Sequence, residues 1–236
     1  MVNIVLLGMT NYCPQNELRL TKSPKRNRAL KNSKSLILLF FIAFFTFVSG
    51  YSADGRSVGA GPIETVRTFQ AALLQIMKEA KNLNIQQRYD FLAPRVKKSF
   101  HIPLMVQIAS GEYWNQATSS ERMDLIIAFR RMSIVTLATL FDGYDGESFK
   151  VIDEKQGPQK TTLVGTNLIK ADKSKIDITY VTRPFKDGWR IIDIIVDNGI
   201  SELMVRRSEY RLTLKNSGIP GLIKILNGKA DELASQ

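Results

Sequence analysis

The stretch that follows residue 61 begins with apolar residues at helical spacing. Positions three and four residues apart predict an amphipathic helix from Pro62 to about Lys81, because that spacing lines one side of a helix. Shorter helices are predicted from Ile85 to about Leu92 and from His101 to Ala109. Pro94 is expected to open a separate turn after the first of these helices.

A long helix is predicted to begin after Thr118, because Thr118 and Glu121 have the spacing of a capping box. It should continue to about Phe141. Its apolar side is expected to comprise Met123, Ile126, Ile127, Ile134, Leu137, Ala138 and Phe141. The segment 142–146, Asp-Gly-Tyr-Asp-Gly, stops the helix. Its aspartates lack the alternate ligand spacing of an EF-hand, so we interpret the segment as a turn and not as a calcium site.

The pattern then changes to β-branched residues and period-2 alternation. Four strands are predicted, at Ser148–Ile152, Thr161–Ile169, Lys175–Thr182 and Trp189–Val196. Their short connections indicate an antiparallel meander. Two closing helices should cover Ser201 to about Asn216 and Pro220 to about Leu233. This order predicts an α+β fold, with a curved sheet of about four strands and several helices on one face, leaving a concave space between them.

The N-terminal region has the three parts of a secretory signal peptide. Residues 36–48 form an apolar run, preceded by basic residues and followed by small ones. A bilayer span needs about 20 apolar residues, so the run is short for a permanent helix. We predict a signal peptide over residues 1–50, cleaved after Gly50 or just after Ala53. A flexible leader at 51–61 and a single domain at 62–236 would follow. An uncleaved N-terminal anchor is the alternative.

The targeting segment accounts for much of the net charge. The chain has 33 basic and 22 acidic residues, for a net charge of +11. Residues 1–50 contain 7 of the basic residues and 1 acidic residue, so the remainder carries 26 against 21, or +5. A nucleic-acid partner is therefore not expected. The single cysteine, Cys13, also lies in this segment, and the mature chain would contain no disulfide.

Few residues could support catalysis. His101 is the only histidine, and beside Ile102 and Pro103 it is expected to have a structural or capping role. Asp193 is the one acid within an apolar strand. We favour a structural hydrogen-bonding role for it, and a general base in an NTF2-like enzyme is the alternative. We expect no catalytic residue, no metal site and no cofactor.

One segment carries a family resemblance. Residues 187–210 read DGWRIIDIIVDNGISELMVRRSEY, and their order of Trp, Asp, Gly-apolar-Ser and Arg-Ser-Glu-aromatic resembles the MlaC-like (toluene-tolerance) family of periplasmic phospholipid-binding proteins. The spacing of Gly111 and Trp114, the aromatic segment 141–149 and the segment 218–226 are similar to that family too. The variant Gly-Ile-Ser at 199–201 is similar to its hopanoid-biosynthesis-associated (HpnM-type) branch.

The resemblance implies an NTF2- or cystatin-like arrangement with an internal lipid cavity. It implies a soluble periplasmic protein that shuttles phospholipid, or a hopanoid lipid, as its cargo. The expected partners are an inner-membrane lipid ABC transporter complex and an outer-membrane lipoprotein, in a system for outer-membrane lipid asymmetry. The alternative function is an enzyme that uses Asp193 as a base on a small hydrophobic substrate.

The predicted cavity lies between the long helix and the sheet, where flexible methionines and other apolar side chains would suit a lipid. Strand alternation separates Ile192 and Ile194 from Trp189, Ile191 and Asp193, and it leaves open which face points inward. The resemblance places Ile200 beside the lipid pocket. The candidate lipid-binding residues are Met105, Phe129, Met132, Leu137, Phe141, Ile178, Tyr180, Ile192, Ile194, Ile200 and Met204.

Overall fold

The computed structural model describes residues 61–235 apart from Asn198. The predicted signal peptide, Cys13 and residues 51–60 of the leader lie outside the described residues. The described helices are α1 (Pro62–Glu79), α2 (Ile85–Ser99), α3 (Ile102–Ser110), α4 (Tyr113–Gln116), α5 (Ser119–Leu140) and α6 (Glu202–Ala234), with a short 3-10 turn at Ala80–Asn82. The strands are β1 (Ser148–Gln156), β2 (Thr162–Ile169), β3 (Lys175–Phe185), β4 (Gly188–Val196) and β5 (Ile200–Ser201).

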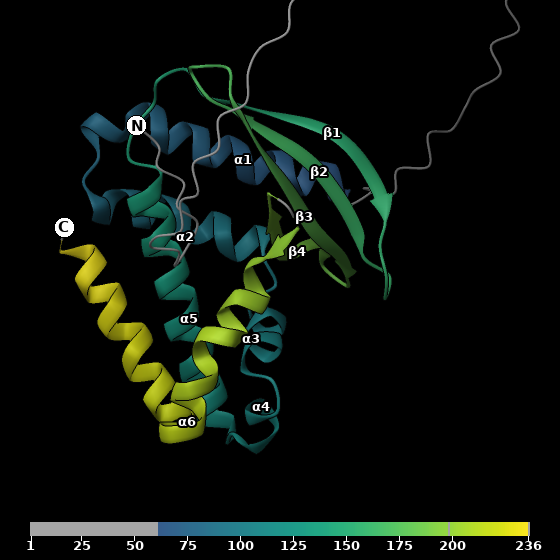
Figure 1. The fold of residues 1–236 in the computed structure, drawn as a ribbon. Helices are drawn as coiled ribbons and strands as arrows, with labels where there is room; N and C mark the ends of the chain where they lie inside the picture. Colours follow the sequence, from purple (N-terminus) through teal and green to yellow (C-terminus); the bar gives the residue numbers. More distant parts are fainter. Residues whose placement is uncertain (1–60, 198, 236) are drawn as a thin grey trace, which may run out of the picture. The chain divides into compact units, whose positions relative to one another are not determined.

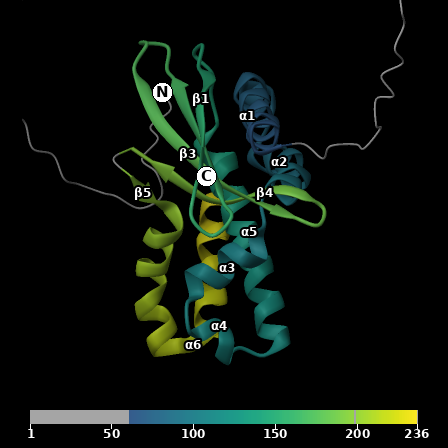
Figure 2. The same ribbon diagram turned by 90° about the vertical axis from the view of Figure 1, so that its right-hand side faces the viewer.

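The strands form one antiparallel sheet in the order of the sequence, β1-β2-β3-β4-β5. The α+β fold class is therefore confirmed, with the two-residue β5 added to the four predicted strands. Helix α1 packs against all four long strands (Figure 1). Helices α3, α5 and α6 pack against one another at the end of the sheet where β4 and β5 lie (Figure 2).

Polar side chains between α1 and the sheet are fully paired. Strand β2 alternates strictly, and its inward residues Val164, Thr166 and Leu168 are buried. Gln70 of α1 donates from Nε2 to Thr166 Oγ1 over 3.1 Å, and Thr166 donates to the carbonyl of Ile178 over 2.9 Å. Burying such groups is tolerated because each donor has an acceptor.

Strand β4 contains a bulge that changes which residues face the helices. Thr182 pairs with Ile191 and Val181 pairs with Asp193, so Ile192 has no partner on β3. The inward residue Tyr180 is opposite Ile194. Residues directly opposite share a face, so Ile191 and Ile194 lie on the same side. The predicted separation of these two side chains was wrong, because simple alternation does not allow for an inserted residue.

Helix α2 is longer than predicted. It continues through Pro94 to Ser99, although a proline removes one backbone hydrogen bond. Leu92 and Val96 on either side of the proline are both buried in the core. The Arg95 side chain also donates to the carbonyl of Phe91 over 2.6 Å, in the turn before the proline. Burial of Leu92 and Val96 in the core offsets the loss, so the helix does not end at Leu92.

Helix α5 begins at the predicted Thr118 capping box. Its predicted apolar side was partly wrong, because Met123 is 58% exposed and Ile127 46% exposed. Leu125, Ala128 and Val135 are buried instead, together with Phe129, Met132 and Ile134. Apolar residues occur around most of this helix, which packs against α2, α3 and α6, so spacing alone does not select one face.

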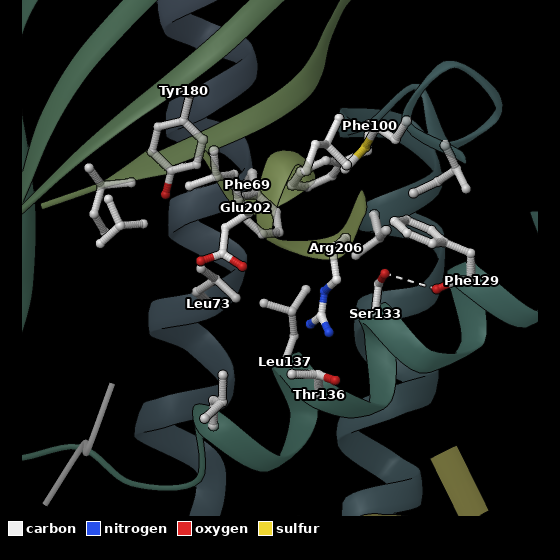
Figure 3. A pocket seen from close by; sticks show the side chains of 18 of the residues that line it. Phe69, Leu73, Phe100, Phe129, Ser133, Thr136, Leu137, Tyr180, Glu202 and Arg206 are labelled. Atoms are coloured by element: carbon white, nitrogen blue, oxygen red, sulfur yellow. Dashed lines mark hydrogen bonds between the residues drawn. The ribbon is translucent and has the colours of Figure 1, made fainter. Parts of the chain in front are cut away.

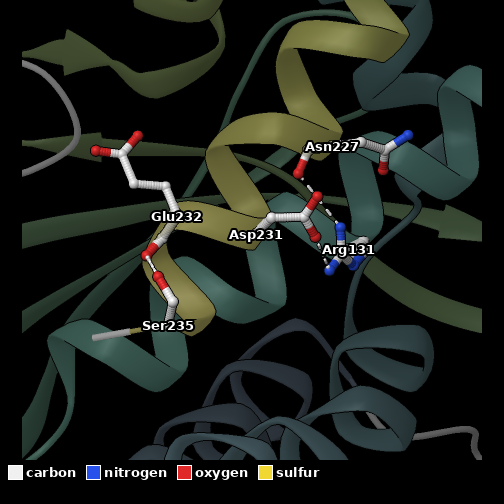
Figure 4. A network of polar contacts seen from close by, with 5 residues as sticks. All are labelled: Arg131, Asn227, Asp231, Glu232 and Ser235. Carbon is white, nitrogen blue, oxygen red and sulfur yellow. Dashed lines mark hydrogen bonds and ion pairs between the residues drawn. The ribbon is translucent and has the colours of Figure 1, made fainter.

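The last helical segment has two arms. Gly218 has φ 60° and ψ −162°, a conformation outside the helical region that glycine adopts without a Cβ clash. The chain turns back there, and the two arms correspond to the two closing helices predicted (Figures 1 and 2). Arg131 of α5 holds the second arm through Asp231, at 2.6 Å, and the carbonyl of Asn227 (Figure 4). No helix among residues 61–235 combines the length and apolar character needed to cross a membrane.

Candidate functional site

An apolar cavity of about 140 Å³ lies among α1, α5, the sheet and the start of α6. Its walls come from segments far apart in the sequence, which the fold brings together (Figure 3). The lining residues are Phe69, Leu73, Val96, Phe100, Ile102, Met105, Phe129, Ser133, Thr136, Leu137, Leu140, Phe141, Ile178, Tyr180, Ile194, Val196, Glu202, Leu203 and Arg206.

Aromatic rings build the wall between α1 and the sheet. Phe69 of α1 is 1% exposed and meets Phe100 edge-on, with ring centroids 4.7 Å apart. It also meets Tyr180 of β3 edge-on at 6.3 Å. Burial raises the pKa of Tyr180 to about 12, so its hydroxyl stays neutral at physiological pH. This wall is tightly packed and carries no charge.

Helix α5 contributes a wall of its own that is apolar except for two hydroxyls. Ser133 donates to the carbonyl of Phe129 and Thr136 donates to that of Met132, each over 2.8 Å. Both side chains thus satisfy their own donors within the helix. Leu137, one turn after Ser133, extends the same wall.

The start of α6 supplies the only two charged side chains among the described residues that line the cavity. Glu202 and Arg206 are one helical turn apart and project into the space between α1 and α5 (Figure 3). Arg206 pairs with Glu209 at 3.1 Å. Glu202 Oε2 is buried and has no hydrogen-bond partner among residues 61–235. Burial raises the pKa of Glu202, an effect opposed by Arg206 and reinforced by Asp193.

Asp193 joins β4 to α6 and does not line the cavity. Its Oδ1 accepts from the backbone N–H groups of Ile194 and Leu203, and its Oδ2 accepts from the Ser201 hydroxyl. Ser201 in turn caps the helix by accepting from Met204 N over 3.1 Å. Burial raises the pKa of Asp193 and these hydrogen bonds oppose the rise. Both oxygens therefore hold the start of α6, as the structural interpretation of Asp193 requires.

The side chain of His101 caps the N-terminus of α3. Its Nδ1 accepts from Leu104 N over 3.1 Å, and its ring stacks on Phe185 at 4.0 Å. Burial lowers the pKa of His101. No group of His, Cys, Asp and Glu within the described residues is arranged to hold a metal ion.

The structure brings seven of the eleven candidate residues to this cavity. They are Met105, Phe129, Leu137, Phe141, Ile178, Tyr180 and Ile194. They come from α3, α5, the end of α5, β3 and β4, so the cavity lies where the long helix faces the sheet.

The other four candidates lie elsewhere. Met132 is buried in the core and does not line the cavity. Ile192 is the unpaired residue of the β4 bulge, and its side chain is buried outside the cavity. Ile200 and Met204 are 41% and 55% exposed. Ile200 does not line this cavity, whereas Glu202 and Leu203, which follow it at the start of α6, do.

The contributions of α1 and of the charged pair to the cavity were not predicted from the sequence. Phe69 and Leu73 were recognisable as one face of a helix, but nothing in their spacing distinguishes core from cavity. A signal did exist for Arg206. Leu203, Tyr210 and Leu214 form the buried stripe of the first α6 arm, and Arg206 occupies a position in that stripe where an apolar residue is expected.

The fold and the cavity together define a protein built to enclose an apolar ligand. The MlaC family model, described as "MlaC protein", matches residues 67–228, and the chain belongs to this family. Among solved structures, it is similar to the phospholipid-binding protein from Ralstonia solanacearum in complex with a phospholipid. The two share 19% sequence identity with a TM-score of 0.64, over 72% of this chain and 97% of that chain. The comparison with curated proteins gave no match.

Proposed function

We propose that this protein binds a phospholipid in the cavity between α1, α5 and the sheet, and carries it across the periplasm. The observation that carries the proposal is the apolar character of the cavity walls, which join Phe69, Phe129 and Ile178 from three separate elements. Membership of the MlaC family and the phospholipid in the Ralstonia solanacearum relative support the choice of ligand.

The cavity must widen to accept such a ligand. Its volume of about 140 Å³ resembles that of an engineered cavity of roughly 150 Å³ that binds benzene, and it is well below the roughly 300–1,000 Å³ of typical ligand pockets. The contacts across it are apolar, so acyl chains can replace them with contacts of the same kind. Each methylene transferred from water contributes about 0.8 kcal/mol, but a lipid leaving a bilayer exchanges one apolar environment for another. Uptake and release can then be nearly balanced.

Transport between membranes is the finer part of the proposal. A lipid carrier would receive phospholipid from one membrane-bound complex and deliver it to another, with an inner-membrane ABC transporter complex and an outer-membrane lipoprotein as partners. The signal-peptide pattern of residues 1–50 supports a periplasmic location. A hopanoid lipid is the alternative cargo, supported by the resemblance of residues 199–201 to the hopanoid-associated branch.

The alternative of an enzyme with Asp193 as its base has less support. A general base needs a free oxygen facing its substrate. Both oxygens of Asp193 accept hydrogen bonds at the start of α6, and the side chain is not part of the cavity wall.

The test is to purify the protein from the periplasm and extract bound lipid with organic solvent for mass spectrometry. We expect near-stoichiometric two-chain phospholipid. A hopanoid in its place would identify the alternative cargo. Protein that remains empty, both as purified and after incubation with phospholipid vesicles, would contradict the proposal. N-terminal sequencing of the same sample tests cleavage after Gly50 or Ala53.

A further inference from the structure

The cavity is apolar except at one place, where α6 contributes Glu202 and Arg206. Their side chains point into the same space from consecutive turns, and within the described residues they form no ion pair with each other (Figure 3). A purely apolar ligand would leave both groups facing hydrocarbon, which is unfavourable for charges. The position of this pair therefore indicates where the polar part of the ligand lies.

Each side chain has hydrogen-bonding capacity that the protein does not use. Glu202 Oε2 is a buried acceptor without a donor among residues 61–235. Arg206 has five N–H donors, and a single hydrogen bond, to Glu209, is formed among the described residues. The side chain of Arg206 is 13% exposed and that of Glu209 is 32% exposed, so this end of the cavity approaches solvent.

We propose that Glu202 and Arg206 form a head-group subsite that selects phospholipids with a primary ammonium group. The phosphate lies on Arg206 and the ammonium lies on Glu202. This inference rests on the proposed function, because it assigns the polar end of the ligand that fills the apolar cavity.

The chemistry of the two groups matches this class of lipid. A guanidinium binds phosphate through two parallel hydrogen bonds, and Arg206 has the donors to do so. A primary ammonium offers three N–H donors, one of which would donate a hydrogen bond to Glu202 Oε2. A quaternary ammonium, as in a choline head group, has no N–H donor. A glycerol head group has hydroxyl donors but no cation. The negative charge of its phosphate is then not balanced by a positive group beside Glu202.

The charges of the surroundings favour the same class. Asp193 and Glu209 lie near Glu202, so the negative charge around it exceeds what Arg206 balances. A cationic group at Glu202 offsets this excess, whereas an anionic head group adds to it. The subsite is therefore expected to prefer a zwitterionic lipid with a primary amine over an anionic one.

In the test, the full-length mature protein is incubated with vesicles. These contain equal amounts of phosphatidylethanolamine, phosphatidylglycerol and phosphatidylcholine, all with the same acyl chains. The protein is repurified, and its bound lipids are quantified by mass spectrometry. We expect phosphatidylethanolamine to be enriched roughly tenfold over phosphatidylcholine, the effect of one charge-assisted hydrogen bond. Glu202→Gln should lose this enrichment while binding the same total amount of lipid. Glu232→Gln, on the exposed side of the second α6 arm, is the matched control and should behave as wild type.

Arg206→Gln gives an independent test of the phosphate position. It should reduce uptake of all three phospholipids and leave uptake of diacylglycerol, which has no phosphate, unchanged. Bound lipid with the composition of the vesicle, or an unchanged preference in Glu202→Gln, would overturn the subsite and leave the carrier function standing. Failure of the wild-type protein to take up any lipid would overturn the carrier function and the subsite together. Circular dichroism confirms that each variant is folded.

Discussion

Two regions around the cavity, the first wall (α1 and the sheet) and the second wall (the start of α6), differ in how their polar groups are paired. In the first, Gln70 and Thr166 lie outside the cavity lining, and Gln70 donates to Thr166, which donates to the carbonyl of Ile178. At the start of α6, Glu202 leaves a buried oxygen unpaired. A polar group that only supports the fold is expected to have all its partners within the chain. The difference therefore assigns the polar pair Gln70 and Thr166 to stability and Glu202 to the ligand.

The largest effect is expected where the first wall is most tightly packed. Phe69→Ala removes a ring that is 1% exposed and contacts both Phe100 and Tyr180. Loss of this buried ring should lower the free energy of unfolding by about 3–5 kcal/mol. Urea denaturation followed by circular dichroism measures it. Leu212→Ala, at a side chain that is 67% exposed, is the control and should change stability by less than about 0.5 kcal/mol.

A loss below about 1 kcal/mol for Phe69→Ala would remove the contrast between the two walls. It would mean that α1 packs loosely against the sheet in the lipid-free protein, so that this wall can move when the cavity widens.

The polar network of the first wall should show an intermediate effect. Thr166→Val removes the hydroxyl that accepts from Gln70 Nε2 and should cost about 1–3 kcal/mol in the free energy of unfolding. Adding Gln70→Leu removes the donor of the same bond, so the double variant should lose less than the sum of the two single variants. Urea unfolding of all four proteins in the cycle measures the coupling. Strictly additive losses would contradict a shared network.

The junction of the sheet with α6 links the two walls, and a smaller effect is expected there. Ser201→Ala removes the cap on Met204 N and the hydroxyl that donates to Asp193. Loss of a helix cap typically costs about 1 kcal/mol. Thermal unfolding should show a melting temperature roughly 2–4 °C lower for a domain of this size. Ser208→Ala, at an exposed position within the same helix arm, serves as the control.

Features of the fold and the site could be predicted from the sequence where they depend on residues close together in the chain. The meander, the capping box at Thr118 and the break near Gly218 each depend on local rules, and all three were predictable. The bulge at Ile192 and the passage of α2 through Pro94 depend on packing against distant segments, which no local pattern contains. The same holds for the site. Apolar residues facing the sheet could be proposed from periodicity, but Phe69 and Glu202 belong to it only because α1 and α6 meet in the folded chain.

The smallest expected effect tests the second wall without any ligand. Burial raises the pKa of Glu202 in the folded protein above its ordinary value of 4.5, so folding favours the protonated form. A group of this kind reduces stability at pH values above the folded pKa. The penalty disappears as pH falls below 4.5, where the carboxyl is protonated in both folded and unfolded states.

Glu202→Gln removes the penalty, so the lipid-free variant should melt at a slightly higher temperature than wild type at pH 7. Below pH 4.5 the two proteins should melt together. Differential scanning calorimetry across this range checks the expectation, with Glu232→Gln as the matched control. A variant that is less stable at pH 7 would show that Glu202 has a partner within the protein. Glu202 would then stabilise the fold, as Gln70 and Thr166 do. A variant that is more stable than wild type and has lost its head-group preference would assign Glu202 to the ligand. The unpaired carboxylate would then lower the stability of the empty protein and gain a hydrogen-bond partner only from the lipid.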